Sequence, residues 1–300
     1  MKQFFLLGAM KSGTTFLTEL LSQHPEICTS SPKEPEFFMD ESLYDNGKKF
    51  YLSEYYNSGE EATYRGDTQS KNLLFPWVPG RIKNLFPDAK LLVLIRNPVD
   101  RLFSHYLHQR RHGREDRSLT KALFDNYQRL RSGRVLTDDK VKKRYQEAFD
   151  NDERWPYYCY LEMGYYHQQI QRYLDCFDDS QLKIIQFQNL TERPAQIAES
   201  IFQFLKLEQF TPESEVKKNR SKIPRYYGLT KLFESLGKLS IADYIPNKFK
   251  ASLKKINLRG KKNAEMSILT QLWLEQHYKE ETKSLESYLE DSFEDWYSLT

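Results

Sequence analysis

A short apolar run that ends at a glycine and leads directly into a helix constrains this chain more than any other stretch. Residues 4–7 are all apolar, as expected of a parallel strand covered on both faces, and Gly8 ends the run. The segment after the turn has apolar residues at helical spacing and stops at His24-Pro25. A strand, a tight turn and a helix N-terminus direct backbone N–H groups and the positive end of the helix dipole to one point. The sequence therefore predicts an α/β fold with an anion-binding turn.

The spacing within this turn distinguishes it from the common nucleotide-binding loops. Gly8 and Gly13 fit the G-x-x-x-x-G of a P-loop. However, Thr14 stands where an NTP-binding loop has its lysine, and the lysine lies inside the turn at Lys11. The glycine fingerprint of a Rossmann fold is also absent from the turn. We therefore expect an anion site of a different kind.

Composition sets limits on the architecture. With 300 residues, of which 39% are hydrophobic, the chain can bury one large core or two small ones, and we favour one elaborated domain. No window approaches the ~18–20 apolar residues of a membrane span, and the N-terminal apolar run is too short for a signal peptide. The cysteines Cys28, Cys159 and Cys176 are odd in number and lack C-x-x-C spacing. They favour a reducing, cytoplasmic setting without a disulfide framework or a structural zinc.

A second strand-to-helix junction carries a conspicuous arginine. Residues 91–95 form a fully apolar run that ends at Arg96. Asn97 suits a helix N-cap, Pro98 the first helical position and Asp100 the first turn. Arg96 is therefore predicted at the carboxyl end of a parallel strand, where open α/β sheets bind their ligands.

Both junctions resemble sulfotransferases that use 3′-phosphoadenosine 5′-phosphosulfate (PAPS). Residues 11–15 match the K-[ST]-G-T-[TS] of the family's 5′-phosphosulfate loop. Residues 96–106 match the R-[ND]-P-x-[ED]-R-x-x-S-x-Y pattern, in which the Arg and the Ser hold the 3′-phosphate. In this chain those residues are Arg96 and Ser104, and Ser104 and His105 lie about one helical turn beyond Asp100 and Arg101.

The resemblance implies a fold, a donor and a set of contacts. It implies the sulfotransferase fold, an α/β arrangement with a P-loop-like open parallel sheet flanked by helices in a single domain, residues 1–300. Residues 1–207 would be the PAPS-binding core, and residues 208–300 a basic, mainly helical part that closes the site. The expected product is adenosine 3′,5′-bisphosphate (PAP), and no metal is expected, because the strand ends in Arg96 rather than a magnesium-binding Asp. The expected donor contacts are Lys11, Ser12, Gly13, Thr14, Thr15, Phe16, Arg96 and Ser104, with Lys11 also covering charge on the leaving phosphate.

Sulfuryl transfer to a hydroxyl or amine also needs a base. In glycan-sulfating families the base is a Glu just before an x-x-Phe-Phe, and Glu34 occupies that position, with Glu36 and His105 as alternatives. One departure concerns the acceptor: related glycan enzymes carry a lysine where this chain has Thr68, so either Lys33 replaces it or the acceptor differs. The resemblance favours a carbohydrate or another hydroxylated acceptor, and it leaves O- versus N-sulfation and the oligomeric state open.

The remaining pattern predicts further elements. Helices are expected near 48–55, 76–86, 119–130, 141–149, 158–177, after Pro194 and over 269–296, with strands ending near 66–70 and over 182–187. Residues 28–38 and most of 40–64 are expected to be loops.

Residues 217–262 form a strongly basic segment. They contain 14 Lys and Arg against two acidic residues, so the other residues sum to about −9 of the chain's net +3. We expect this segment to close over the nucleotide, with Arg259 and Lys261 in a cofactor loop, or to form a peripheral contact with anionic lipid. A nucleotide- or polyanion-binding protein and a P-loop kinase are the competing functions, and the preferred function needs no nucleic-acid partner.

Overall fold

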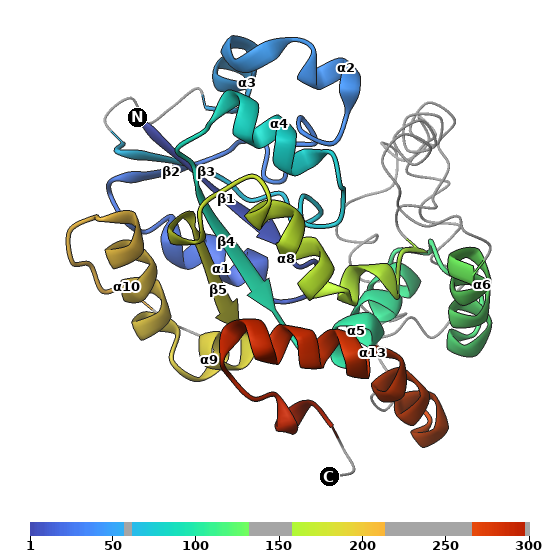
Figure 1. The fold of residues 1–300 in the computed structure, drawn as a ribbon. Helices are drawn as coiled ribbons and strands as arrows, with labels where there is room; N and C mark the ends of the chain where they lie inside the picture. Colours follow the sequence, from blue (N-terminus) through green and yellow to red (C-terminus); the bar gives the residue numbers. More distant parts are fainter. Residues whose placement is uncertain (57–61, 132–157, 214–265, 298–300) are drawn as a thin grey trace, which may run out of the picture.

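Five parallel strands form one sheet in the order β2-β3-β1-β4-β5 (Figure 1). The computed structural model describes residues 1–56, 62–131, 158–213 and 266–297. The strands are β1 (Lys2–Gly8), β2 (Ile27–Thr29), β3 (Tyr64–Asp67), β4 (Lys90–Ile95) and β5 (Leu182–Gln186). The first strand lies at the centre, paired with β3 on one side and β4 on the other. The predicted open parallel sheet is confirmed.

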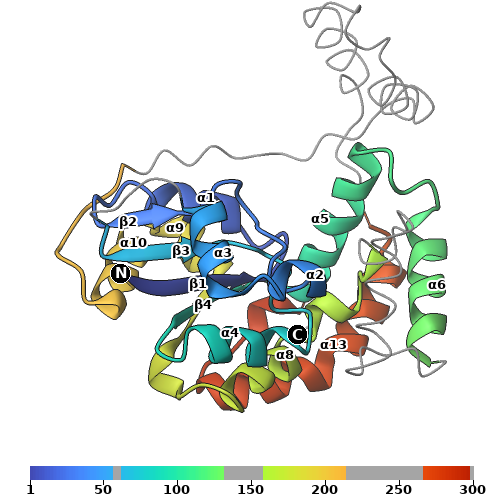
Figure 2. The same ribbon diagram turned by 90° about the horizontal axis from the view of Figure 1, so that it is seen from above.

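Helices cover both faces of the sheet, as Figures 1 and 2 show. Alternate residues of β1 point to opposite faces. Phe5 and Leu7 belong to one buried cluster, whereas Phe4 and Leu6 belong to another. The first cluster includes residues of α3 (Gly47–Tyr55), α4 (Val78–Leu85) and α8 (Tyr166–Leu174). The second includes residues of α1 (Thr14–Leu21), α9 (Phe187–Glu192) and α10 (Pro194–Leu205). This layering explains the continuous apolar runs of the central strands.

A third cluster lies beyond the carboxyl end of the sheet. It joins residues of α5 (Pro98–Arg111), α6 (Leu119–Arg131) and α13 (Ile268–Leu289) with Tyr160 and Leu161, which precede the 3₁₀ turn η2 (Glu162–Gly164). Tyr278 of α13 donates a hydrogen bond to the Leu161 carbonyl (2.9 Å). The chain then reaches η5 (Glu294–Trp296), where the Trp296 carbonyl accepts a hydrogen bond from the Asn97 side chain (2.9 Å). Residues far apart in the sequence thus meet at the start of α5.

Three predicted segments differ from the structure. The expected loop at 28–38 begins inside a short strand, β2, and the segment before α3 contains an additional helix, α2 (Glu41–Tyr44). The helix predicted over 158–177 begins only at Tyr166. The earlier residues Tyr160 and Leu161 are fully buried in the third cluster, and the apolar periodicity at Tyr166, Ile170 and Tyr173 belongs to α8 alone.

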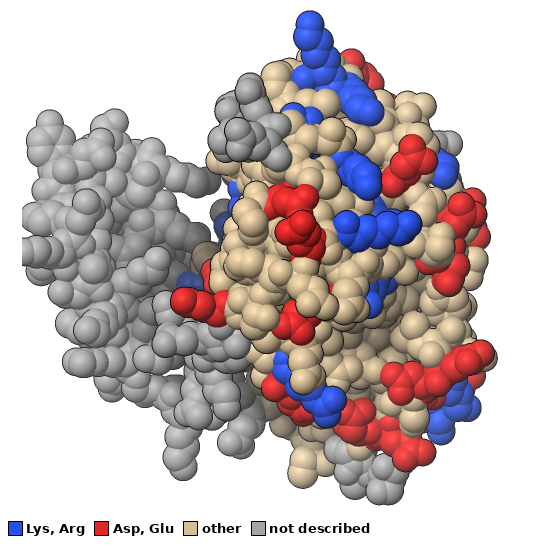
Figure 3. Space-filling model, turned by 90° about the vertical axis from the view of Figure 1, so that its left-hand side faces the viewer, with Lys and Arg blue, Asp and Glu red and all other residues tan. Residues whose placement is uncertain are grey.

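Some predictions fall outside the described residues. They are the helix at 141–149, the basic segment 217–262 and its residues Arg259 and Lys261. Within the described ranges, no helix is both long enough and apolar enough to cross a bilayer. The face shown in Figure 3 carries basic and acidic side chains interspersed, without a broad area of one sign.

Candidate functional site

The turn after β1 has an unusual backbone that brings its groups to the carboxyl end of the sheet. The Ala9 N–H donates to the Leu94 carbonyl of β4 (2.8 Å), which ties the turn to the neighbouring strand. Lys11 and Gly13 both have left-handed backbones, with φ of 72° and 95°. A Cβ at Gly13 would also lie 3.0 Å from the ring of Phe187. Glycine is therefore required there by both conformation and space.

Helix α1 begins at this turn without a side-chain cap. Gly13 is its N-cap residue, so the first N–H groups of the helix remain available to an anion. Thr14 is buried and Thr15 is exposed. Ser12 is fully buried, so it can contribute its backbone more readily than its hydroxyl. Phe16 packs against the second core cluster, which leaves its amide as its contribution to the site.

Lys11 lies among other cationic groups. Its Nζ is 3.4 Å from Nδ1 of His108 on α5, and its carbonyl accepts a hydrogen bond from the Arg96 guanidinium (3.2 Å). Burial and the charges of Arg111 and Arg96 lower the pKa of Lys11 to about 8, although Glu34 opposes this shift. An anion placed among these groups would relieve their mutual repulsion.

One face of α5 extends this cationic region. Ser104, His108 and Arg111 follow one another at intervals of four and three residues, so they share a face of the helix. Since His108 contacts Lys11, this face is turned towards the anion-binding turn. Burial, followed by the charge of Lys11, lowers the pKa of His108 to about 3, so the imidazole is neutral at ordinary pH.

Arg96 occupies the other end of the region, at the carboxyl end of β4. Its guanidinium lies 4.8 Å from the centre of the Phe187 ring and 3.8 Å from Asp100. A cavity of about 140 Å³ opens here, lined by Arg96, Asp100, Phe187 and Trp296 among others. Arg96 at the end of β4 and Ser104 on α5 thus belong to one strand-to-helix unit.

Glu34 approaches the same region from the loop after β2. Its backbone is left-handed, with φ of 63°. Its carboxylate accepts a hydrogen bond from the Ser70 hydroxyl (2.9 Å), and the electrostatic influence of Glu34 on Lys11 and Lys33 places these three charges near one another. The structure thus brings the predicted base and the predicted cation into one site.

The basic residues near Glu34 are partly committed to other contacts. Lys33 donates to the Thr15 hydroxyl (2.8 Å), and Lys71 forms an ion pair with Glu36 (3.0 Å). Thr68 is fully buried, so its side chain cannot present a group to an acceptor. Glu36 is therefore a paired carboxylate, whereas Glu34 lies beside the cations of the turn.

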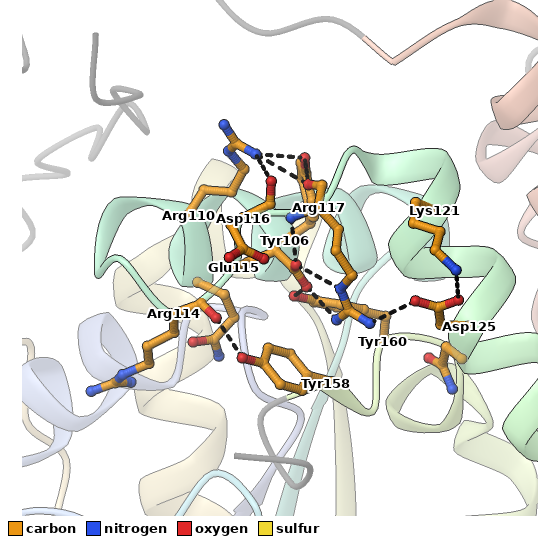
Figure 4. A network of polar contacts seen from close by, with 12 residues as sticks. Tyr106, Arg110, Arg114, Glu115, Asp116, Arg117, Lys121, Asp125, Tyr158 and Tyr160 are labelled. Atoms are coloured by element: carbon orange, nitrogen blue, oxygen red, sulfur yellow. Dashed lines mark hydrogen bonds and ion pairs between the residues drawn. The ribbon is translucent and has the colours of Figure 1, made fainter. Parts of the chain in front are cut away.

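His105 and the connection after α5 have structural roles. His105 is fully buried, 3.1 Å from Gln109 and in ring contact with Tyr160, so it is not placed to act as a base. Beyond the helix, Arg117 pairs with the buried Glu115 (2.7 Å), which also accepts from Tyr160 (Figure 4). The labelled Arg114 side chain points away from this network, and its charge is one of those acting on His108.

Sequence reasoning missed several residues of the site. His108 and Arg111 could have been found from their helical spacing to Ser104. Gln69 and Ser70 contact the loop of Glu34 from 35 and 36 residues away, and no local pattern indicates such a contact.

The known proteins that resemble this chain are sulfotransferases. A family profile described as a sulfotransferase domain matches residues 1–227. The chain is 29% identical over 213 residues to "Bifunctional heparan sulfate N-deacetylase/N-sulfotransferase 2" of Homo sapiens, covering 69% of this chain and 22% of that protein. It is 30% identical over 210 residues to the enzyme numbered 3 of the same organism, covering 68% and 22%. The chain thus spans about a fifth of the length of these curated relatives.

A crystal structure of a sulfotransferase from Alicyclobacillus acidocaldarius shares the fold, with a TM-score of 0.67 and 24% identity over 99% of this chain and 98% of that one.

Proposed function

The chain belongs to the sulfotransferase family, and on this premise we propose that it moves a sulfuryl group from PAPS to a hydroxyl or amine of an acceptor. The observation that carries the proposal is the meeting of Lys11 and Arg96 beside an uncapped helix N-terminus, with Arg111 on the face of α5 that is turned towards them and the charge of Glu34 acting on Lys11. These cations repel one another in the free protein, and the phosphates of a nucleotide would compensate them.

The residues present fit such a donor. Lys11 and the N–H groups at the start of α1, which no side chain caps, would hold the 5′-phosphate. Arg96 and Ser104 would hold the 3′-phosphate. When bound, PAPS supplies the sulfuryl group and departs as PAP.

The protein's own groups supply the remaining chemistry. Lys11 covers the charge that develops on the leaving phosphate, and Glu34 takes the proton of the acceptor. His108 is neutral, and its Nδ1 faces the Lys11 ammonium. If Lys11 donates to that nitrogen, the proton of the imidazole sits on Nε2. His108 would then orient Lys11 without adding a charge.

For the acceptor we propose a carbohydrate or glycoconjugate. The curated relatives are named for heparan sulfate, and this supports a glycan for the part of their length that this chain matches. Related glycan enzymes carry a lysine at the position of Thr68, but Thr68 is buried and the nearby Lys71 is paired with Glu36. Both observations support an acceptor that differs in detail from those of the related glycan enzymes.

A thermal-shift measurement with PAP in EDTA tests the donor assignment. At about a hundredfold excess over its dissociation constant, a ligand stabilises by about 2.7 kcal/mol, which shifts the melting temperature of a 300-residue chain by roughly 4 °C. Lys11→Ala and Arg96→Ala should each remove most of this shift, whereas Lys279→Ala, at an exposed position on α13, should keep it. A larger stabilisation by ATP with magnesium than by PAP would overturn the proposal in favour of a kinase-like site.

A further inference from the structure

The segment that follows β3, residues 68–71, holds the loop of Glu34 through the side chains of Gln69, Ser70 and Lys71. Gln69 Nε2 donates to the carbonyls of Glu34 (2.9 Å) and Pro35 (3.3 Å). The Ser70 hydroxyl donates to Glu34 Oε1 (2.9 Å), and Lys71 pairs with Glu36 (3.0 Å). We infer that this segment positions the Glu34 carboxylate for proton transfer, with Gln69 fixing its backbone and Ser70 its side chain. The inference rests on the proposed function, because it assumes that Glu34 is the base.

Gln69 stabilises a backbone conformation of Glu34 that a non-glycine residue rarely adopts. A non-glycine residue with φ of 63° is uncommon and persists where its surroundings determine it. The Gln69 side chain donates to the carbonyls of two successive residues, Glu34 and Pro35, and its Oε1 accepts from the Lys71 N–H (3.2 Å). Since Gln69 is only 1% exposed, it has little freedom to move away from these contacts.

Ser70 acts on the carboxylate itself. A hydrogen bond from a hydroxyl stabilises the ionised form of a carboxylate, and it also fixes one of the two oxygens in place. With Oε1 engaged by Ser70, Oε2 is the oxygen to which the acceptor proton would pass. The charged groups that act on Glu34 are Lys11 of the turn, Lys33 of its own loop and Asp67 of β3.

The segment is in turn anchored to the sheet. Asp67 is fully buried and accepts hydrogen bonds from the Gln69 N–H (2.9 Å) and the Tyr51 hydroxyl (2.8 Å). A Cβ at Gly8 would lie 2.8 Å from the Ser70 carbonyl, so the segment packs directly against the turn after β1. Glu34 is thereby connected to two strands of the sheet and not only to its own loop.

The test compares Gln69→Ala and Ser70→Ala with Thr68→Val. Thr68 is a buried neighbour whose hydroxyl has no hydrogen-bond partner among the described residues, so valine changes little. We expect Ser70→Ala and Gln69→Ala to keep the PAP dissociation constant, measured by calorimetry, and to lower kcat about 10- to 100-fold. Ser70→Ala should lower kcat without raising the KM for the acceptor, and Ser70→Thr should restore kcat.

The carboxyl-carbon NMR resonance of labelled Glu34, assigned with Glu34→Gln, supplies a readout that needs no turnover. Its chemical shift should change in Ser70→Ala, where the hydrogen bond is lost, and stay unchanged in Thr68→Val. An unchanged chemical shift in Ser70→Ala, or turnover equal to that of Thr68→Val, overturns the positioning role even while PAP binds. Failure of PAP to bind the wild type overturns the proposed function, and the NMR result still reports the Ser70 contact. If Gln69→Ala does not fold, the Ser70 variants decide.

Discussion

At the scale of single residues, the site brings together cations whose charged forms are disfavoured by burial. The Arg96 guanidinium donates a hydrogen bond to the Lys11 carbonyl. Burial lowers the pKa of both side chains, because it disfavours their charged forms. The nearby carboxylate, Glu34, only partly offsets this. The repulsion and burial of these cations destabilise the free protein, and a bound anion would compensate their charge.

The pKa of Lys11, about 8, makes a pH dependence of PAP binding testable. A bound phosphate favours the charged ammonium and raises the pKa above its value in the free protein. Affinity should therefore be constant below pH 8 and fall by up to about tenfold per pH unit above it, until the pKa of the bound state is reached. Calorimetric titrations between pH 7 and 10 would measure this. In Lys11→Arg, which stays charged throughout, the fall should disappear.

Glu34→Gln tests the base by removing its charge and keeping its shape. Transfer should fall about 10²- to 10⁴-fold, while PAP affinity should change little. Glu36→Gln is the matched control, because Glu36 is two residues away and engaged with Lys71. Radiolabelled transfer from PAPS to a panel of sugars would give both rates. Loss of activity in Glu36→Gln with activity retained in Glu34→Gln would move the base to Glu36.

At the scale of elements, the start of α5 is the junction on which the site is built. The Asn97 side chain accepts hydrogen bonds from the N–H groups of Val99 (2.9 Å) and Asp100 (3.3 Å). Its amide nitrogen donates to the Trp296 carbonyl (2.9 Å). One residue thus caps the helix that carries Ser104 and also fastens it to the C-terminal 3₁₀ turn.

Asn97→Ala should lower the free energy of unfolding by about 1–2 kcal/mol, because the cap and the bond to Trp296 are both lost. Asn97→Asp keeps an acceptor for the cap but cannot donate to Trp296, so its loss should be smaller. Urea denaturation of both variants would measure the two contributions. Equal losses in the two variants would show that the cap contributes little.

At the scale of the whole molecule, basic side chains gather at the carboxyl edge of the sheet. In the proposed function these side chains, and not a metal ion, would face the phosphates of the donor. A divalent cation brought to Lys11, Arg96 and Arg111 would be repelled. We therefore expect EDTA to leave the transfer rate unchanged and added magnesium not to raise it. Transfer assays in EDTA and in millimolar magnesium would check this, and a rate that depends on magnesium would contradict it.

The sequence predicted the parts of the fold that depend on local pattern. The runs at β1 and β4 are fully buried and therefore fully apolar, and Asn97-Pro98 carries a capping signal that the structure confirms. β2 escaped prediction because three residues with one buried side chain give no periodicity, and pairing with β3 creates the strand. Lys11 and Arg96 were found from their motifs, whereas the contacts of Gln69 and Ser70 exist only because the sheet brings β3 beside the loop of Glu34.

The bond between Asn97 and Trp296 also has a consequence for the order in which the protein can mature. The anion-binding turn and β4 are translated before α5, but α5 is fastened at its start by a residue translated almost 200 positions later. Tyr166, whose hydroxyl donates to the Arg96 carbonyl (2.8 Å), also contacts the Trp296 ring. A nascent chain that lacks η5 would therefore carry every donor-binding residue predicted from the two motifs and still lack both of these contacts with Trp296. The junction at Arg96 is therefore fastened only after residue 296 has been synthesised.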